Sequence, residues 1–189
     1  MRVLIAEDEA LIRMDLREML EEEGHEIVAE ARDGAEAVSF ARSFTPDIVF
    51  MDINMPGVGG LEAAEVIGAE RIAPVVMVTA FSQGAYVEQA ASAGAMAYVV
   101  KPFTRTDVLP AMSLAIARFA EASALAAEVE DLGERLETRK TVDRAKGILM
   151  ARGMSEAEAF KRLQKLAMDK RKTLKEIAEA VVIANEAAE

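Results

Sequence analysis

The first 120 residues alternate five short apolar runs with longer segments of helical periodicity. The runs are mostly β-branched or apolar on both faces, which is typical of strands buried in a parallel sheet. Strands that alternate with helices in this way indicate an α/β fold, with helices on both faces of the sheet. The predicted strands are Val3–Ala6, Ile27–Ala29, Ile48–Met51, Val75–Val78 and Ala97–Val100.

Helical segments fill the intervals between these predicted strands. Ala10–Glu22 has apolar residues at helical spacing, and Gly24 follows as a helix stop. Asp33 is placed to cap a second helix. Further helices are expected at Gly60–Gly68, Gln83–Ser92 and Thr104–Phe119. We therefore predict a flavodoxin-like, doubly wound sheet of five parallel strands in the order 2-1-3-4-5.

The sequence after Lys101 carries no further strand signal and is helical almost throughout. Pro110 is tolerable near the start of a long helix. Four apolar residues then follow at spacings of four, three and four, which is typical of a coiled-coil seam. One long helix packed on its own domain would give the same pattern over so short a stretch. The four residues are Leu125, Val129, Leu132 and Leu136.

Two capping boxes mark the starts of the last helices, Ser155 with Glu158 and Thr173 with Glu176. The segment 141–152 continues the preceding helix and ends at Gly153, and Lys170-Arg171-Lys172 is expected in a loop. The predicted organisation is an α/β domain at 1–120, a helical coiled-coil linker at 121–140 and a small three-helix domain at 141–189. The first helix of that last domain may be counted from near residue 128.

Charge is distributed unevenly between these parts of the chain. The net charge is −11, and residues 1–120 alone contribute −10. Residues 139–175 carry 12 basic against 4 acidic residues, which suggests two units with different partners. A solvated helical surface rich in Lys and Arg is an equally good interpretation of that segment.

Features that the sequence lacks limit both the cellular location and the chemistry that we expect of the protein. The absence of cysteine excludes a disulfide framework, a thiolate metal site and a cysteine nucleophile. The opening apolar run is too short for a signal peptide, and we expect no later membrane span. A cytoplasmic location is therefore expected.

Acidic side chains follow two neighbouring strands of the predicted sheet. Glu7 and Asp8 come after the first strand and Asp52 after the third. The carboxyl ends of such strands meet in one crevice, where clustered carboxylates need a neutralising cation. Mg²⁺ suits a site with few carboxylates and several waters. We expect Asp8 and Asp52 as direct ligands, Glu7 acting through water, and a backbone carbonyl near Asn54 completing the set.

The same crevice has the groups that phosphoryl transfer needs. An aspartate can attack phosphorus to form an acyl phosphate, and Asp52 is placed to do so. Lys101 follows the fifth strand and offers a cation, while Thr79 follows the fourth and offers a hydroxyl. Ordinary loop acids and helix caps would explain any one of these residues, but not all of them at strand ends together.

The motifs over about residues 1–120 resemble the response-regulator receiver family. They are Glu7-Asp8, Asp52-Ile53-Asn54-Met55-Pro56-Gly57, Thr79-Ala80 and Lys101-Pro102-Phe103. The resemblance implies that a sensor histidine kinase phosphorylates Asp52, and that Asp8, Asp52 and the Asn54 carbonyl bind Mg²⁺.

The family also implies a signalling face of helix 4, strand 5 and helix 5, on which Tyr98 matches a rotating aromatic switch. A packed amphipathic side chain is the alternative interpretation of Tyr98. Lys101–Pro102 would carry the family's cis peptide. Gly59-Gly60 departs from the Asp-Gly that the family often has, without loss of a ligand.

About residues 128–186 resemble the ANTAR family of RNA-binding antitermination domains. The most specific stretch is Ala145-Lys146-Gly147-Ile148-Leu149-Met150. The resemblance implies a three-helix unit that dimerises through a preceding coiled coil. It also implies binding to paired RNA hairpins in leader transcripts, so that a terminator does not form. With the receiver motifs, it implies a homodimer when the chain is phosphorylated.

Basic residues of this part can replace the counterions that condense on RNA. Gly147 lies within a predicted helix at a cost of about 1 kcal/mol relative to Ala, which suggests a close approach to the backbone there. Tight packing between helices at Ala145 and Gly147 is the alternative to RNA contact. The RNA-binding candidates are Arg144, Lys146, Gly147, Arg152, Arg162, Lys165, Lys170, Arg171 and Lys172.

Two other functions compete with an RNA-binding response regulator. A DNA-binding regulator would use the last helix, Leu174–Glu189, in a helix-turn-helix, but Lys175 is its only base and it carries four glutamates. An enzyme that hydrolyses phosphate esters would need a general acid or base in addition to the nucleophile, and none is placed for that role. We expect no enzymatic activity beyond slow self-catalysed phosphotransfer and dephosphorylation.

Overall fold

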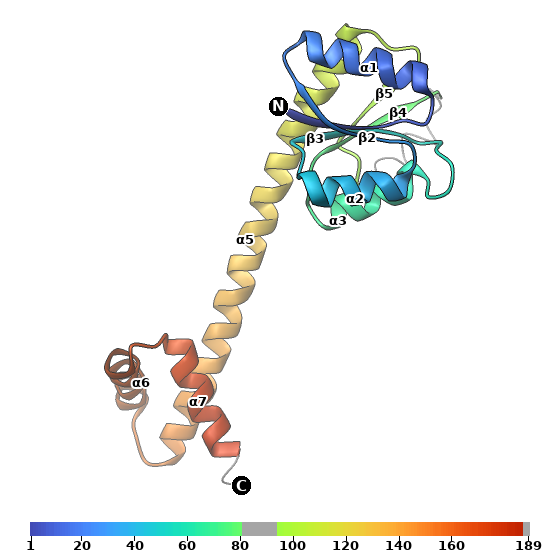
Figure 1. Cartoon of the computed structure of the whole chain (residues 1–189). Helices are drawn as coiled ribbons and strands as arrows, with labels where there is room; N and C mark the ends of the chain where they lie inside the picture. The colour runs from blue at the N-terminus through green and yellow to red at the C-terminus, as the bar shows by residue number, and fades with distance from the viewer. Residues whose placement is uncertain (81–93, 187–189) are drawn as a thin grey trace. The chain divides into compact units, whose positions relative to one another are not determined.

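The protein is described by a computed structural model that covers residues 1–80 and 94–186. It forms two compact units, Met1–Ala124 and Leu125–Glu189. Helix α5, Arg105–Ala151, is continuous and contributes residues to both units (Figure 1). The predicted helix at Gln83–Ser92 lies outside the described residues.

A parallel sheet of five strands forms the centre of the first unit, in the order β2-β1-β3-β4-β5. The predicted flavodoxin-like order is therefore confirmed. Each predicted run lies within its observed strand, and the apolar side chains of β1, β3 and β4 are buried on both faces. The strands are β1 Arg2–Ala6, β2 Glu26–Ala31, β3 Ile48–Asp52, β4 Val75–Thr79 and β5 Ala97–Val100.

Helices cover both faces of this sheet (Figure 1). On one face α2, Gly34–Phe44, and α3, Gly60–Ala69, enclose a core around Leu4, Met51 and Met77. On the other face α1, Ala10–Glu22, and the start of α5 enclose a core around Ile5, Phe50 and Val76. The Asp33 side chain accepts a hydrogen bond from the Glu36 amide at 2.8 Å, so the predicted cap of α2 is confirmed.

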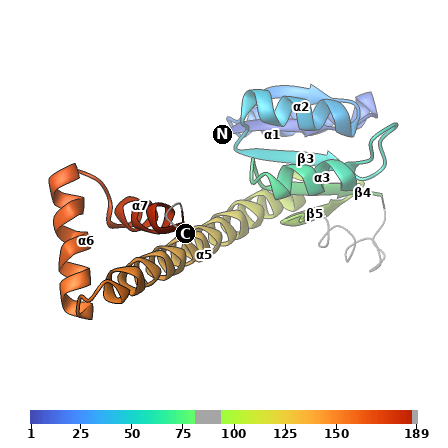
Figure 2. The ribbon, with the colours of Figure 1, turned by 90° about the horizontal axis from the view of Figure 1, so that it is seen from below.

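The second unit is a three-helix bundle built from the end of α5, α6 (Glu156–Lys170) and α7 (Leu174–Glu186) (Figure 2). Both predicted capping boxes are present: Glu158 and Ser155 bond reciprocally, and so do Glu176 and Thr173. The expected loop at 170–172 is shorter than predicted. Lys170 is the last residue of α6, and Arg171 caps the helix in a left-handed conformation with φ of 52°. The core of the unit consists of Val142, Ala145, Leu149, Ala159, Leu163, Ile177, Ala178 and Val182.

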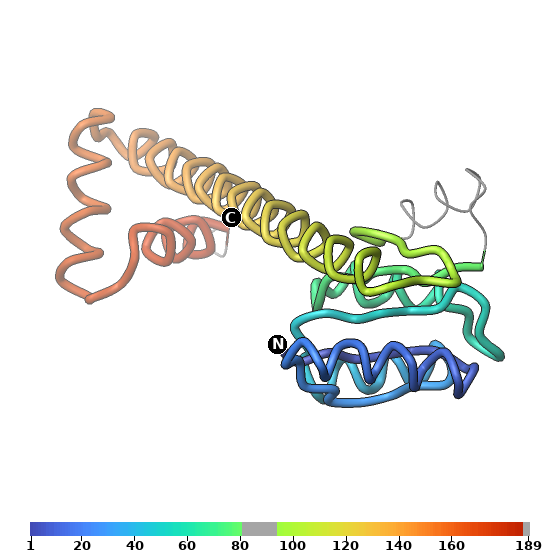
Figure 3. Tube along the Cα trace, turned by 90° about the horizontal axis from the view of Figure 1, so that it is seen from above, coloured from blue at the N-terminus to red at the C-terminus, as the bar shows by residue number. Residues whose placement is uncertain are grey.

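The apolar stripe in the middle of α5, a helix that Figure 3 traces along its backbone, is exposed to solvent within the described residues. Its four side chains are 54–62% exposed, so the alternative that this stretch packs on its own domain is wrong. An exposed stripe at this spacing is typical of a helix that pairs with another helix. The predicted coiled coil stays a prediction. The stripe consists of Leu125, Val129, Leu132 and Leu136.

Among the described residues, α5 is long and apolar enough to cross a membrane by length and composition. An 18-residue window within it has a mean hydropathy of 1.4, which corrects the expectation that no later segment approaches such a span. A single helix of this kind is weak evidence for a membrane span, since the core helix of a soluble protein can have the same length and hydropathy. The start of α5 contributes Val108, Met112 and Ala115 to the core of the first unit.

Candidate functional site

Three carboxylates meet at the carboxyl end of the sheet. Glu7 and Asp8 directly follow β1, and Asp52 is the last residue of β3, which pairs in parallel with β1. One carboxylate oxygen from each of the three residues lies within 4.8 Å of the others. The strand order predicts this convergence, because the ends of adjacent parallel strands lie side by side.

Lys101 follows β5 and reaches into the same cluster. Its Nζ lies 2.7 Å from Glu7 Oε2 and 3.1 Å from Asp52 Oδ2. The lysine side chain is 11% exposed, and those of Glu7 and Asp52 are 2% and 5% exposed. A buried cation therefore bridges two of the three acidic groups, as the sequence predicted for the residue after the fifth strand.

Burial dominates the protonation behaviour of this cluster. Burial raises the pKa of Asp52, and the charge of Lys101 and its hydrogen bond oppose that rise. Burial likewise raises the pKa of Glu7, where Lys101 opposes the rise and Asp52 adds to it. Burial alone would lower the pKa of Lys101, but the two carboxylates outweigh it and raise that pKa. Without another cation, the cluster holds its negative charge at a cost.

The donor set fits a hard divalent cation. Three carboxylates with one lysine leave two negative charges in excess, and all available ligand atoms are oxygens. Asp8 is exposed, so the cluster is open to solvent on that side. These features match Mg²⁺, which keeps several waters and takes few protein ligands.

Other predicted residues surround the cluster. Thr79 ends β4 and is 2% exposed, and the Lys101–Pro102 peptide bond is cis, as predicted. The backbone N–H of Asn54 hydrogen-bonds the Asp52 carboxylate and lowers its pKa, whereas the role of the Asn54 carbonyl stays a prediction. Tyr98 on β5 is 46% exposed, and its role as a switch stays a prediction.

Arg13 is a residue of the site that the sequence analysis missed. It lies on α1 and is 8% exposed. Its Nη1 donates to the backbone carbonyl of Glu7 at 2.6 Å and to that of Asp8 at 3.3 Å, and its Nε pairs with Glu30 at 3.0 Å. Glu30 also pairs with the more exposed Arg17. Arg13 thus ties the loop that carries two acidic groups to the end of β2. The only hint of this role in the sequence was the position of an arginine on the helix that follows Glu7 and Asp8.

Gly60 contacts the backbone of Asp52 closely. A Cβ atom at this position would lie 1.8 Å from the Asp52 carbonyl oxygen, a distance that no side chain tolerates. The Gly60 amide donates to the Ile53 carbonyl at 3.1 Å, so α3 begins against the end of β3. A Cβ atom at Gly59 would meet only the Ile53 oxygen at 3.9 Å. Of the Gly59-Gly60 pair, only Gly60 is required by packing.

The RNA-binding candidates of the second unit fall into two groups. Four of the basic candidates have partners within the protein. Lys146 lies between Asp143 and Glu156, with its Nζ 2.8 Å from a carboxylate oxygen of each. Three further candidates have one partner each. These three pairs are Arg144 with Glu186, Arg152 with Asn185, and Lys172 with Glu176. The other four are exposed and make no ion pair within residues 1–80 and 94–186. They are Arg162, Lys165, Lys170 and Arg171.

Ala145 and Gly147 differ in their surroundings. Ala145 is fully buried in the core of the bundle, so the helix-packing interpretation holds for it. Gly147 is exposed, and a Cβ atom there would meet no described atom within 4 Å. Packing between helices of the same chain therefore does not explain this glycine. Contact of Gly147 with RNA stays a prediction.

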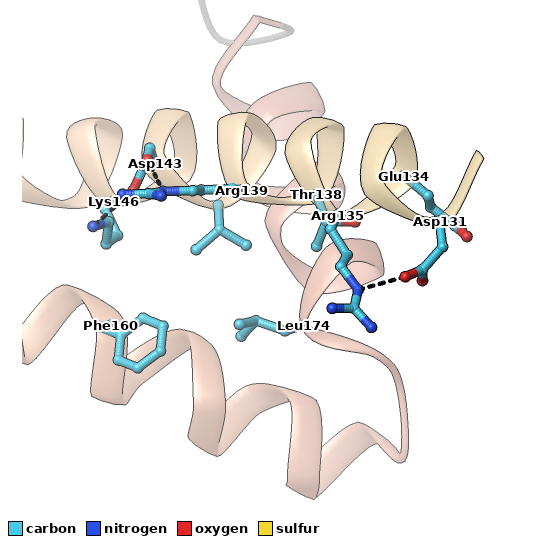
Figure 4. Close-up of a pocket in the computed structure, with 10 residues that line it drawn as sticks. Asp131, Glu134, Arg135, Thr138, Arg139, Asp143, Lys146, Phe160 and Leu174 are labelled. Atoms are coloured by element: carbon cyan, nitrogen blue, oxygen red, sulfur yellow. Dashed lines mark ion pairs between the residues drawn. The ribbon is translucent and has the colours of Figure 1, made fainter. Parts of the chain in front are cut away.

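A groove lies in the second unit between α5 and the helices that pack on it (Figure 4). It encloses about 430 Å³, and Val142, Phe160 and Leu174 supply its apolar lining. Its rim is charged, but Arg135 pairs with Asp131 at 3.0 Å and Arg139 approaches Asp143 at 4.0 Å. The cations of this groove are therefore neutralised by acids of the same rim.

Comparisons with known proteins agree with both units. Residues 3–113 match the model of the response regulator receiver domain, and residues 130–182 match that of the ANTAR domain. The transcriptional regulatory protein PdtaR of Mycobacterium tuberculosis is 59% identical over 182 residues, covering 96% of this chain and 89% of that protein. The chemotaxis protein CheY of Thermotoga maritima is 39% identical over 113 residues, covering 59% of this chain and 94% of CheY.

The first unit also resembles solved structures. One is a CheX–CheY–BeF3–Mg²⁺ complex from Borrelia burgdorferi, with a TM-score of 0.55, 31% identity, and coverage of 59% of this chain and 85% of that one.

Proposed function

This chain belongs to the response regulators that join a receiver domain to an ANTAR domain, and we propose that Asp52 is its phosphoacceptor. It is a two-component response regulator whose ANTAR output binds RNA and acts in transcription antitermination. A histidine kinase is its partner in signalling. We place the protein in the cytoplasm and keep the division into 1–120, 121–140 and 141–189 as a proposal.

The geometry around Asp52 supports phosphoryl transfer to this residue. A carboxylate oxygen of Asp52 forms a bond to phosphorus while the bond from phosphorus to the kinase imidazole breaks. Lys101, 3.1 Å from Asp52 Oδ2, neutralises charge on the incoming phosphoryl oxygens. The Thr79 hydroxyl donates to one of those oxygens. The site supplies a nucleophile and charge neutralisation, which suffices for a single loading event.

Mg²⁺ fits the acidic cluster and would neutralise phosphoryl oxygens during the transfer. Asp8 and Asp52 would hold it directly, Glu7 would act through water, and the Asn54 carbonyl would complete the protein ligands. The observation that supports this proposal is the approach of three carboxylate oxygens to within 4.8 Å beside one buried lysine. The related CheY structure from Borrelia burgdorferi, which is described with Mg²⁺, agrees with this choice of metal.

Phosphorylation would control the output through dimerisation. The signalling face around Tyr98 would shift toward a dimer-competent state, and α5 is continuous from there into the ANTAR unit. Pairing of the exposed stripe at Leu125, Val129, Leu132 and Leu136 would bring two ANTAR units together. Two linked units could then engage two RNA hairpins in a leader transcript at once, with a gain from avidity.

Coupling is tested by loading the full chain with acetyl phosphate and Mg²⁺. Analytical ultracentrifugation and binding to an RNA with two hairpins in tandem are compared before and after loading. We expect a shift to dimer and tighter binding, both lost in Asp52→Asn. If loading changes neither the mass of the assembly nor the affinity, the proposed coupling is wrong.

A DNA-binding output is not favoured. Helix α7 would be the recognition helix, but Lys175 is its only basic residue among three glutamates, Glu176, Glu179 and Glu186. Lys175 also lies 3.9 Å from Glu134. This helix surface would repel the phosphates that flank a major groove.

A further inference from the structure

Helix α6 has a row of exposed side chains at every third position. Arg162, Lys165, Met168 and Arg171 are all exposed, the last being the residue that caps the helix. Positions three apart form an inclined ridge on a helix, so each of these side chains neighbours the next one along the ridge. We call them the α6 row. Figure 2 shows that α6 stands at the end of its unit, with α7 lying beside α5.

The cations of the α6 row, like Lys170, differ from Arg144, Lys146, Arg152 and Lys172 in making no ion pair or side-chain hydrogen bond in the described part of the chain. Arg162, Lys165 and Arg171 make no ion pair among the residues that the structure describes. The acids of the first turn of α6 are engaged elsewhere, since Glu156 pairs with Lys146 and Glu158 caps the helix with Ser155.

Asp169 is the one acid in the rest of α6, against Lys161, Arg162, Lys165 and Lys170. The outer part of the helix therefore carries an uncompensated positive charge.

A phosphate group gains less from a cation that already has an acidic partner. Lys146, for example, is only 18% exposed at its side chain and lies between two carboxylates. A phosphate that approached it would also meet the charges of Asp143 and Glu156. The groove of Figure 4 has the same property, because its rim pairs its own charges. The three cations of the α6 row make no ion pair in the described part of the chain, and Asp169 is the one acid beside them on the helix.

Met168 gives the row a second kind of contact. Its side chain is 79% exposed, the largest exposure among the large apolar side chains that the structure describes. It lies between Lys165 and Arg171 along the row. RNA-binding proteins read unpaired loop bases by stacking and apolar contact, and a thioether side chain adapts readily to an apolar surface. An apolar side chain flanked by cations matches an unpaired base flanked by phosphates.

We infer that the α6 row is the surface with which the ANTAR unit holds the loop of an RNA hairpin. Arg162, Lys165 and Arg171 contact phosphates, and Met168 packs on an unpaired loop base. This inference rests on the proposed RNA-binding function and adds which surface of the ANTAR unit contacts the RNA. It also separates the candidates, because Arg144, Lys146, Arg152 and Lys172 are then engaged within the protein.

The first test compares two charge-matched variants of the full chain, loaded with acetyl phosphate and Mg²⁺. One is Arg162→Gln/Lys165→Gln/Arg171→Gln, and the control is Arg144→Gln/Lys146→Gln/Arg152→Gln. The probe is a synthetic RNA with two stem-loops in tandem, titrated over a range of salt concentrations. Because each phosphate contact adds about 0.7 to 0.9 to the salt slope, the row variant should lose about 2 to 3 from it. At 0.1 M salt this corresponds to roughly 100-fold weaker binding.

The control variant should keep a salt slope and affinity close to those of the natural chain. The row variant should keep the helical circular-dichroism spectrum and melting temperature, since the three row cations have no partner in the described structure. The control variant should keep the helical spectrum, because it loses only pairs at the surface. If the row variant keeps its slope, or if the control loses as much, the inference is wrong while RNA binding stands. If the natural chain fails to bind the hairpin RNA even at low salt, the proposed RNA function itself fails.

A second variant, Met168→Gln, tests the base contact without changing charge. We expect weaker binding to the stem-loop RNA, an unchanged salt slope, and unchanged binding to a continuous RNA duplex of the same stem sequence. Equal losses on both RNAs, or no loss on either, would contradict the assignment of Met168 to a loop base.

Discussion

The side-chain nitrogen of Lys101 lies 3.1 Å from Oδ2 of Asp52 in a buried setting. The same nitrogen lies 2.7 Å from Glu7, so one cation serves two carboxylates. Burial still raises the pKa of both acids above their ordinary values. Ionisation of Asp52 and of Glu7 is therefore less favourable in the folded chain than in the unfolded chain when no metal ion is bound.

Replacing Asp52 with Asn should stabilise the chain in Mg²⁺-free buffer at neutral pH. Because the pKa of Asp52 is raised on folding, the folded state favours its protonated form. The stability that this group contributes is present below its unfolded pKa and is lost as the pH rises through its folded pKa. The gain from Asp52→Asn should therefore grow with pH over this acidic range and then level off. Urea unfolding across a pH series measures it.

Saturating Mg²⁺ should reverse the order of stability, since the natural chain keeps the ligand that Asp52→Asn weakens. A stability difference that does not vary with pH in the metal-free buffer would contradict the role given to buried charge.

Gly60→Ala should disturb Asp52, whereas Gly59→Ala should be tolerated. A Cβ atom at Gly60 would lie 1.8 Å from the Asp52 carbonyl oxygen, so α3 or the end of β3 must shift. Overpacking of this kind costs about 1–3 kcal/mol or more. We expect a lower unfolding free energy and slower phosphoryl loading for Gly60→Ala alone. Equal behaviour of the two variants in urea unfolding would show that the contact is unimportant.

Arg13→Met should weaken Mg²⁺ binding more than Arg17→Met. Both arginines pair with Glu30, but only Arg13 donates to the carbonyls of Glu7 and Asp8. Loss of a group that orients metal ligands typically costs 10–100-fold in metal affinity, so we expect about tenfold or more for Arg13→Met. Calorimetric titration with Mg²⁺ gives both Kd values. Similar affinities for the two variants would mean that Arg13 only packs.

Gly147→Ala should stabilise the isolated protein and weaken its binding to RNA. Nothing described lies within 4 Å of a Cβ at Gly147, so the change raises helix stability by up to about 1 kcal/mol. If an external molecule approaches this backbone, the added methyl group reduces affinity. Gly133→Ala, also on α5 with open space around it, is the control for the stability gain. Thermal unfolding and titration with tandem-hairpin RNA measure the two effects, and unchanged RNA affinity would remove Gly147 from the contact surface.

The sheet and the acidic cluster were predictable because both depend on local sequence and strand order. The run Ile48–Met51 is apolar on both faces, which is typical of a strand buried in a parallel sheet. Once β1 and β3 are neighbours, Asp8 and Asp52 must approach each other. The local sequence pattern was enough to predict the site, because each functional residue directly follows, or ends, a strand in the sequence.

Contacts between distant residues could not be predicted in this way. The Arg13–Glu30 pair spans 17 positions and depends on how α1 packs against β2. The close approach of Gly60 to Asp52 depends on the start of α3. Nor does the sequence reveal that Lys146 is held by Glu156 of another helix while Lys165 is free of ion pairs in the described chain. Such distinctions need the packed structure.

Mass spectrometry of the full chain after incubation with acetyl phosphate tests the phosphoacceptor most directly. With Mg²⁺ present, we expect one added phosphoryl group, and peptide mapping should place it on Asp52. Asp52→Asn should remain unmodified, and so should the natural chain after chelation of the metal. A phosphoryl group on another residue, or loading of Asp52→Asn at the natural rate, would contradict the account.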